Sequence, residues 1–185
     1  MADPICYLDM DGVIADFVGA CLWNHDRDDL TPEDITEWDF HKTILGCKTE
    51  DDLWAFWAFK GYNFWADIIK PEPWANDLVR TLEERFGDRI VIVTSVAPDS
   101  PRCYEGKCDW IEDHFPQFKG KVVACSKKWL LAHPNAILID DKEKTVDKFQ
   151  QNGGKVILFP RTWNSGRTID KYRRIDVVRN ILSVE

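Results

Sequence analysis

The sequence predicts an α/β fold, in which a parallel β-sheet carries helices on both faces. Short apolar runs of strand length alternate with stretches of helical periodicity along the chain, which is the pattern of such folds. Residues 90–95 and 136–141 begin as continuous apolar runs, typical of strands buried on both faces. Both runs end in polar side chains, where the chain must leave the sheet. These observations define the core of the predicted fold.

Each element follows from a local pattern. Residues 5–8 form a short apolar run bounded by Pro4 and Gly12, and residues 74–86 carry apolar side chains at helical spacing up to Gly87. The pair Gly153-Gly154 ends another helical stretch. We therefore expect strands at 5–8, 90–95, 122–124, 136–141 and 156–159, and helices at 14–23, 74–86, 108–115, 127–132, 147–152 and 176–183.

The segment between the first two strands has a different composition. It is rich in acids and aromatics, and Thr31 followed by Pro32 is typical of a helix start. It shows short helical patterns without a convincing alternating strand, and it is too long for an ordinary connection. We interpret residues 17–71 as a small helical cap inserted after strand 1, with residues 1–16 and 72–185 as the core domain.

Composition limits the function. A chain of 185 residues with 44% hydrophobic and 30% charged residues fits one globular domain, or one core with an inserted unit. The net charge of −8 argues against long nucleic acid as a partner but allows a mononucleotide. No apolar stretch is long enough to cross a bilayer and no secretory leader is evident, so we expect no membrane partner and a cytoplasmic location. A homodimer is compatible with the sequence, which does not fix the oligomeric state.

Chemically active side chains follow three of the predicted strands. Asp9 and Asp11 follow the first, Thr94 and Ser95 end the second, and the acids Asp140 and Asp141 end a later one, with Lys127-Lys128 between the last two pairs. The carboxyl ends of parallel strands share one edge of a sheet, so these groups should converge. Acids, hydroxyls and a lysine around one point suit Mg²⁺-assisted phosphoryl transfer. Alone, the Asp-x-Asp-Gly motif could equally be a solvated turn.

In this order the motifs resemble those of the haloacid dehalogenase (HAD) superfamily of phosphohydrolases. They are residues 7–13 (Tyr-Leu-Asp-Met-Asp-Gly-Val), residues 92–95 (Ile-Val-Thr-Ser), the lysine at 127 or 128, and residues 137–141 (Ile-Leu-Ile-Asp-Asp). More narrowly, Asp-Met-Asp-Gly-Val, Phe17 and the later Leu158-Phe159 with Trp163-Asn164 resemble the 5'(3')-deoxyribonucleotidase family. The resemblance implies a three-layer, Rossmann-like parallel sheet as the core.

The resemblance also implies roles for the acids. Asp9 would be the nucleophile that forms an aspartyl-phosphate. Asp11 would be the general acid for the leaving oxygen and then the base for water. The Mg²⁺ cofactor would be held by Asp9, by the backbone carbonyl of Asp11 and by one of Asp140 and Asp141. We favour Asp141 as the direct ligand, with Asp140 behind it.

By the same resemblance, Thr94 and Ser95 would contact phosphate through hydroxyl and backbone N–H groups. Lys128 is preferred to Lys127 as the phosphate-binding lysine, although its spacing to the final acids is longer than usual in the family, which leaves both open. Lys107 is interpreted as a solvated surface lysine rather than an auxiliary cation.

The cap would supply the substrate pocket. Phe17, Trp38 and Phe40 are candidates for stacking on a base, an interaction worth about 1–3 kcal/mol per base. Other aromatics at helical spacing are interpreted as the core of a small bundle: Trp54, Trp57 and Phe64. The four histidines show no ligand spacing and are interpreted as surface or structural residues: His25, His41, His114 and His133.

The leading hypothesis is an Mg²⁺-dependent phosphatase for (deoxy)ribonucleoside monophosphates, with a nucleotide as its small-molecule partner. Two alternatives remain within enzymes: another small phosphorylated metabolite, or nucleic-acid 3'-phosphate ends, which the acidic balance disfavours. A third is a phosphate-binding module without catalysis.

Overall fold

The protein is built on one five-stranded sheet in which all neighbouring strands pair in parallel, in the order β3-β2-β1-β4-β5. The computed structural model describes residues 3–43, 46–49, 52, 59–97, 100 and 102–184. The strands are β1 (Ile5–Leu8), β2 (Ile90–Thr94), β3 (Val122–Ala124), β4 (Ala136–Asp140) and β5 (Lys155–Leu158). The predicted α/β fold with a parallel sheet is confirmed, and all five strands lie where the sequence placed them to within one or two residues.

The strand order determines where a ligand can bind. The chain runs from β1 outward to β2 and β3, then crosses to the other side of β1 to form β4 and β5. Leu8 of β1 is therefore paired with Ile92 on one side and with Ile139 on the other. The direction of winding reverses between β1 and β4, and open α/β sheets bind ligands outside the carboxyl ends of the strands at such a switch point.

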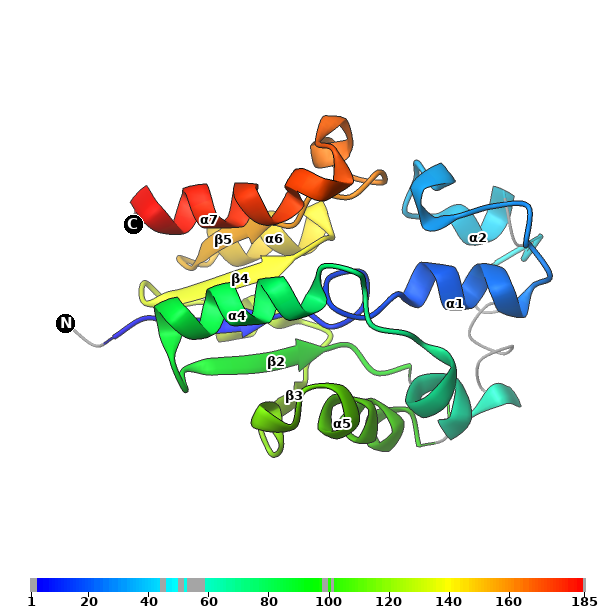
Figure 1. The fold of residues 1–185 in the computed structure, drawn as a ribbon, viewed down its shortest axis with the longest axis horizontal. Helices are drawn as coiled ribbons and strands as arrows, with labels where there is room; N and C mark the ends of the chain where they lie inside the picture. The colour runs from blue at the N-terminus through cyan, green and yellow to red at the C-terminus, as the bar shows by residue number, and fades with distance from the viewer. Residues whose placement is uncertain are drawn as a thin grey trace.

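Helices cover the sheet. They are α1 (Phe17–Asn24), α2 (Phe40–Thr43), α4 (Ala75–Phe86), α5 (Cys103–His114), α6 (Glu143–Gln151) and α7 (Arg174–Val184). α4 packs against β1, β2 and α7, and α6 packs against β4 and β5 (Figure 1). α4 buries Leu78, Val79, Leu82 and Phe86 on one face, as the 3.6-residue period predicts.

Two helices begin at least four residues earlier than the sequence pattern predicted, and α7 begins two residues earlier. α5 starts at Cys103, five residues before the predicted start, and α6 starts at Glu143, four residues before it. The buried face of α5 begins with Cys103, Gly106 and Lys107, which do not read as an apolar stripe. The first turn of α6 is polar, so hydrophobic periodicity cannot reveal it.

Residues 17–71, called the cap segment below, lie between β1 and α4, which leads into β2. The chain leaves the core and returns at adjacent points, because Ala15 and Pro71 form an antiparallel bridge. The described part of the cap segment contains α1, α2, a 3₁₀ helix at Pro32–Asp34 and a π-helix at Phe64–Ile68, and no strand of the sheet. Thr31 and Asp34 form a capping box at the 3₁₀ helix, where the sequence predicted a helix start. Figure 1 shows α1 and α2 beside the carboxyl ends of the strands.

The aromatic residues of the cap segment are only partly described. Trp54 and Trp57 lie outside the described residues, so their predicted place in a small bundle stays a prediction. Phe64 is fully buried against Phe17 and Trp65, which agrees with a core position. Among the described helices, none is both long and apolar enough to cross a membrane.

Candidate active site

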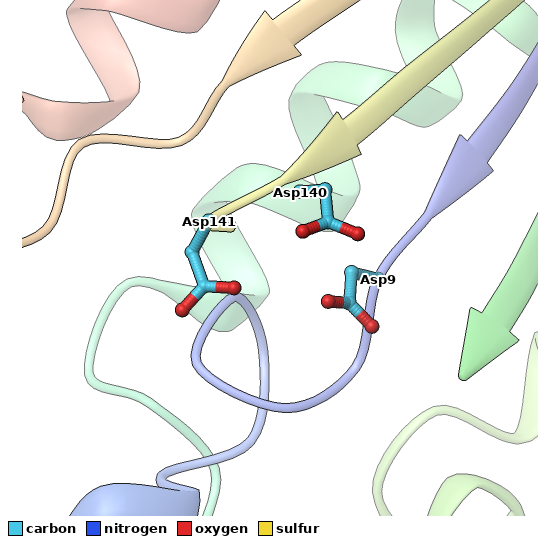
Figure 2. Close-up of side chains that lie close together, drawn as sticks. All are labelled: Asp9, Asp140 and Asp141. Atoms are coloured by element: carbon cyan, nitrogen blue, oxygen red, sulfur yellow. The ribbon is translucent and has the colours of Figure 1, made fainter. Parts of the chain in front are cut away.

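Three carboxylates converge at the switch point. Asp9 follows β1, Asp140 is the last residue of β4, and Asp141 follows it (Figure 2). Each side chain offers an oxygen atom that lies within 4.8 Å of those of the other two, and all three residues are buried. The predicted convergence of these strand ends is therefore present in the structure.

Lys128 is the counter-charge of this cluster. Its Nζ lies 2.7 Å from Asp140 Oδ2 and 2.5 Å from Asp9 Oδ1, and its side chain is buried. Lys127, by contrast, is exposed. The sequence did not decide between Lys127 and Lys128 as the phosphate-binding lysine. Of these two, only Lys128 faces the acids.

Burial and crowding shift the pKa values of the cluster. Burial raises the pKa of Asp9 well above its ordinary value, and the attraction of Lys128 only partly opposes this. Burial and the neighbouring charge of Asp140 raise the pKa of Asp141 to about 7. Burial alone would lower the pKa of Lys128, but Asp140 and Asp9 outweigh it and raise the pKa, so the ammonium group stays charged. Three carboxylates against one ammonium group favour a further cation between them.

Asp140 and Asp141 have different hydrogen-bond partners. Both oxygens of Asp140 are engaged, since Oδ2 accepts from Lys128 and Oδ1 accepts from the backbone N–H of Lys142 at 2.8 Å. Asp141 Oδ2 accepts from Trp163 Nε1 at 2.8 Å, whereas its Oδ1 is buried and has no hydrogen-bond partner among the described residues. A buried carboxylate oxygen without a partner is costly unless a ligand satisfies it.

Asp11 is held by Lys107, which the sequence analysis interpreted as a solvated surface residue. That interpretation is wrong. The side chain of Lys107 is 1% exposed, and its Nζ donates to Asp11 Oδ2, to Thr94 Oγ1 at 2.9 Å and to Ser95 O at 2.8 Å. Lys107 follows Cys103 by four residues and precedes Ile111 by four, so helical spacing places it on the buried face of α5.

The hydroxyls after β2 occupy different positions. Thr94 is fully buried, and its Oγ1 lies between Lys107 and Asp11, behind the surface of the site. Ser95 is exposed and lines the cavity described below. Of the two hydroxyl residues predicted to contact phosphate, Ser95 is therefore the one whose side chain faces the cavity.

The loop after Asp9 passes close to Asp141 (Figure 2). Gly12 lies in this loop with φ at 78°, a conformation that side chains rarely adopt. A Cβ atom there would also overlap Asp141 Oδ2 and lie 3.3 Å from the ring of Trp163. Both the turn and the close approach therefore require glycine.

A cavity of about 340 Å³ opens in front of the acids. The carboxyl edge of the sheet and the helices and loops beside it contribute charged residues: Asp9, Asp11, Lys107, Lys128, Asp140 and Lys142. The cap segment contributes aromatic rings, one imidazole and one carboxylate: Phe17, Trp38, Asp39, Phe40, His41 and Trp65. The three aromatic residues predicted to face a base thus all line this cavity. Charged side chains thus line the side of the cavity next to the sheet, and aromatic rings line the side formed by the cap segment.

The aromatic wall is supported on both sides of the cavity. Phe17 is stacked parallel to Trp65, with ring centroids 6.0 Å apart. Trp38 packs edge-on against Trp163 at 6.4 Å, and Lys142 Nζ lies 4.6 Å from the centroid of the Trp38 ring. The rings of the cap segment are thereby fixed to groups that also surround the acids.

His41 was interpreted as a surface or structural residue, but it lines this cavity. It is 5% exposed, so it is not on the surface. The residues near His41 in the sequence do not form a spacing typical of ligand-binding motifs. Its place in the cavity follows only from the fold.

A family model matches residues 3–182 of the chain. It describes the 5' nucleotidase, deoxy (pyrimidine), cytosolic type C protein family (NT5C). The chain belongs to this family. It is therefore a phosphoric monoester hydrolase with a HAD-like fold, as the motif resemblance implied. A search of curated proteins found no match.

Solved structures with a similar fold come from distant relatives. A HAD phosphatase from Thermococcus onnurineus shares 13% identity over 98% of this chain and 99% of its own, with a TM-score of 0.50. A HAD family hydrolase from Deinococcus radiodurans R1, solved with phosphate and sodium, shares 14% identity over 83% and 79%, with a TM-score of 0.46. An alanine variant of a HAD family enzyme from Bacteroides thetaiotaomicron, solved with magnesium and inorganic phosphate, shares 12% identity over 91% and 100%, with a TM-score of 0.43. At these identities the likeness concerns the fold alone.

The Trp163-Asn164 pair, which suggested the nucleotidase family in the sequence, positions Asp141. Asn164 Nδ2 donates to the backbone oxygens of Asp141 and Phe159 at 2.8 and 2.9 Å. Trp163 Nε1 donates to the side-chain carboxylate of Asp141. In this member of the NT5C family, the chain after β5 therefore fixes both the backbone and the side chain of Asp141.

Arg161 connects this segment to the loop after Asp9. Its buried guanidinium donates to the backbone oxygen of Gly12 at 3.1 Å and to Glu72, and it lies between the rings of Trp74 and Trp163 at 4.8 and 4.3 Å. Burial raises the pKa of Glu72 to about 8, although Arg161 opposes this. A guanidinium group held between two aromatic rings is restricted in its movement, so Arg161 is a rigid support for this segment.

Proposed function

We propose that the chain hydrolyses (deoxy)ribonucleoside monophosphates to nucleoside and phosphate, using Mg²⁺ and an aspartyl-phosphate on Asp9. One observation carries this proposal. Lys128 Nζ bridges the carboxylates of Asp9 and Asp140 on the charged side of a cavity whose other side carries aromatic rings. The charged side suits a phosphate group, and the aromatic side suits a base.

The residues present fit a magnesium ion. Mg²⁺ prefers oxygen ligands and takes one or two carboxylates, completing its shell with water and phosphate. Asp9 and Asp141 would supply carboxylate oxygens and Asp11 its backbone carbonyl, while Asp140 would orient Lys128 behind them. The partnerless Oδ1 of Asp141 supports Asp141 over Asp140 as the direct ligand. When bound, the ion would neutralise charge on the carboxylates and on the phosphoryl oxygens.

Asp9 would act as the nucleophile. Its Oδ1 is engaged by the N–H of Met10 at 2.7 Å and by Lys128, which leaves Oδ2 for attack on phosphorus. The new bond joins Asp9 to phosphorus as the ester bond breaks, and the electron pair of that bond goes to the leaving oxygen. Lys128 and Ser95 would stabilise the charge on the phosphoryl oxygens.

Asp11 would carry the proton. Its Oδ2 is held by Lys107, and its buried Oδ1 has no hydrogen-bond partner among the described residues. Oδ1 would give its proton to the leaving oxygen in the first step. It would then take a proton from the water that attacks phosphorus, which releases phosphate and restores the Asp9 carboxylate.

The cap segment would select the substrate. We treat residues 17–71 as a cap domain inserted into a core of residues 1–16 and 72–185. Cavities of about 300–1,000 Å³ are typical of small-molecule sites, and Phe17, Trp38 and Phe40 offer faces for a base. The family description names a deoxypyrimidine 5' nucleotidase, so a deoxypyrimidine 5'-monophosphate is the first substrate to test. The net charge of −8 supports a free nucleotide over nucleic-acid ends as the substrate. The family description supports a cytoplasmic location.

Phosphate release from a panel of monophosphates would test the proposal. The panel contains dUMP, dCMP, UMP, dAMP, glucose 6-phosphate and a 3'-phosphorylated oligonucleotide, each with Mg²⁺ and with EDTA. We expect nucleotides to turn over fastest and EDTA to abolish turnover. Faster turnover of the sugar phosphate would instead favour another small metabolite, and turnover of none would favour a binding module.

Two variants test the proposed nucleophile. Asp9→Asn should abolish turnover and the mass increase of a trapped phosphoryl-enzyme, whereas the control Asp147→Asn alters an exposed aspartate of α6 and should leave both unchanged. Unchanged turnover by Asp9→Asn would refute the mechanism.

A further inference from the structure

Among the four histidines, all of which lie in the described part of the chain, only His41 has a buried ring nitrogen without a hydrogen-bond partner. Its Nε2 is buried and has no hydrogen-bond partner in the described part of the chain. The Nδ1 atoms of His25 and His114 lie 2.9 Å from backbone oxygens of their own helices, and that of His133 accepts from Asn135 N–H at 3.3 Å. A buried ring nitrogen without a partner costs free energy, which a ligand that supplies the missing hydrogen bond would recover.

The position of His41 indicates which part of a ligand would supply that bond. His41 lines the cavity beside Phe40 and belongs to the cap segment. The groups proposed to hold phosphate all come from the sheet edge or the loops beside it, such as Asp9 and Lys128. His41 therefore lies on the aromatic side of the cavity, where the nucleoside end of a substrate would be.

We propose that His41 Nε2 forms a hydrogen bond with the polar edge of the base, while the aromatic rings contact its faces. The inference rests on the proposed nucleotidase function and adds a residue that determines specificity. Stacking on rings such as Phe17 accepts any flat group, because every base has a π-face. A buried polar atom instead rejects a flat group that lacks a matching donor or acceptor.

Three substitutions of His41 separate hydrogen bonding from shape. His41→Phe keeps a flat ring but removes the polar nitrogen. His41→Gln places its amide group near the position of Nε2, and His41→Asn places its amide near Nδ1. His133→Phe is the matched control, because His133 is exposed and does not line the cavity.

The measured quantity is the ratio of kcat/KM for dUMP to kcat/KM for phenyl phosphate, a flat aromatic ester without polar substituents on its ring. We expect His41→Phe and His41→Asn to lower this ratio about ten- to hundred-fold, the effect of one lost hydrogen bond to a buried group. His41→Gln should restore most of it, and His133→Phe should not change it. Comparing dUMP with dCMP, whose bases have opposite donor and acceptor patterns at positions 3 and 4, shows whether Nε2 donates to or accepts from those positions.

Binding of free deoxyuridine gives a readout without catalysis. Calorimetry should show weaker binding to His41→Phe than to the wild type. The melting temperature of ligand-free His41→Phe should be equal to or above that of the wild type, because an unsatisfied buried group has been removed. An unchanged dUMP preference in His41→Phe, or a lower melting temperature with equal losses on both esters, would overturn the role of His41. If the wild type neither hydrolyses nor binds any nucleotide, the proposed function itself fails.

Discussion

Trp163 donates its indole N–H to Asp141 Oδ2 across 2.8 Å, and Asp141 Oδ1 is buried without a partner in the part of the chain that the structure describes. The indole therefore determines which of the two oxygens is available to a cation. Trp163 is itself fixed by the guanidinium of Arg161, which lies 4.3 Å from its ring centroid. The orientation of one carboxylate in the site thus depends on a residue 22 positions later in the chain.

Trp163→Phe should weaken Mg²⁺ binding about ten- to hundred-fold, the usual cost of losing a partner that orients a metal ligand. The phenyl ring keeps most of the packing, so the protein should still fold. Titration calorimetry with Mg²⁺ measures the effect. Trp23→Phe is the control, because Trp23 is 63% exposed and outside the site. Equal Mg²⁺ affinities for the two variants would contradict the orienting role.

Lys107→Met should lower kcat on the order of a hundred-fold, because Asp11 loses the group that holds it. It should also reduce the free energy of unfolding by about 2–3 kcal/mol, less than for a fully buried pair because the Asp11 side chain is 20% exposed. Steady-state kinetics and urea unfolding give the two values. Lys119→Met breaks an exposed pair with Glu112 and should cost less than about 1 kcal/mol with no change in kcat. If Lys107→Met and Lys119→Met lowered kcat equally, the proposed role of Lys107 in the mechanism would be wrong.

Gly12→Ala should reduce both stability and Mg²⁺ affinity, since the new Cβ would displace Asp141. Gly120→Ala is a suitable comparison, because Gly120 has a similar φ of 72° and open space around it. A left-handed conformation alone costs an L-residue about 1–2 kcal/mol, so Gly120→Ala should lose that amount and bind Mg²⁺ normally. Thermal unfolding and Mg²⁺ titration separate strain from overlap. Normal Mg²⁺ binding by Gly12→Ala would show that Asp141 tolerates the displacement.

The metal-free protein should lose stability as the pH rises from about 4 to about 7. Burial, with the charge of Asp140, raises the pKa of Asp141 from 3.8 to about 7, so the folded state binds the Asp141 proton more tightly than the unfolded chain does. Stability from this group is therefore present at low pH and is lost as the carboxyl ionises, by at most about 1.4 kcal/mol per pH unit.

Urea unfolding in EDTA across this pH range tests the expectation against Asp141→Asn. As the pH rises, the free energy of unfolding of the wild type should fall relative to that of Asp141→Asn. Saturating Mg²⁺ should oppose the shift, because the ion binds the deprotonated carboxylates. Parallel curves for the two proteins in EDTA would mean that Asp141 ionises in the fold as it does in water.

Much of the sheet edge could be predicted from the sequence, because its residues lie directly after apolar runs. The parallel pairing of Leu8 with Ile92 and Ile139 follows from burial on both faces, and it brings Asp9 and Asp140 together. These are short-range signals, in which the strand and its terminal acid are adjacent. Their roles in binding metal or phosphate stay predictions.

Lys107 and His41 could not be found in this way. Each contacts the site from a helix, so its position depends on how that helix packs rather than on its sequence neighbours. A lysine on a helix face reads as solvated until its neighbours show that the face is buried. For His41, nothing in the local pattern distinguishes it from a surface residue. The positions of side chains throughout the cap segment depend in the same way on packing between residues far apart in the sequence.

The two crossings between core and cap segment form hydrogen bonds with each other. Asp16 N–H donates to Lys70 O at 2.8 Å, and Glu72 N–H donates to Ile14 O at 2.9 Å. The entropy of closing a loop grows only with the logarithm of its length, so doubling the length of the segment between such paired ends costs roughly 0.6 kcal/mol. The cap segment, proposed above to select the substrate, can therefore lengthen or shorten during evolution at little cost to folding. Selectivity can then diverge among descendants of one ancestral chain while the sheet edge that holds Asp9 stays unchanged.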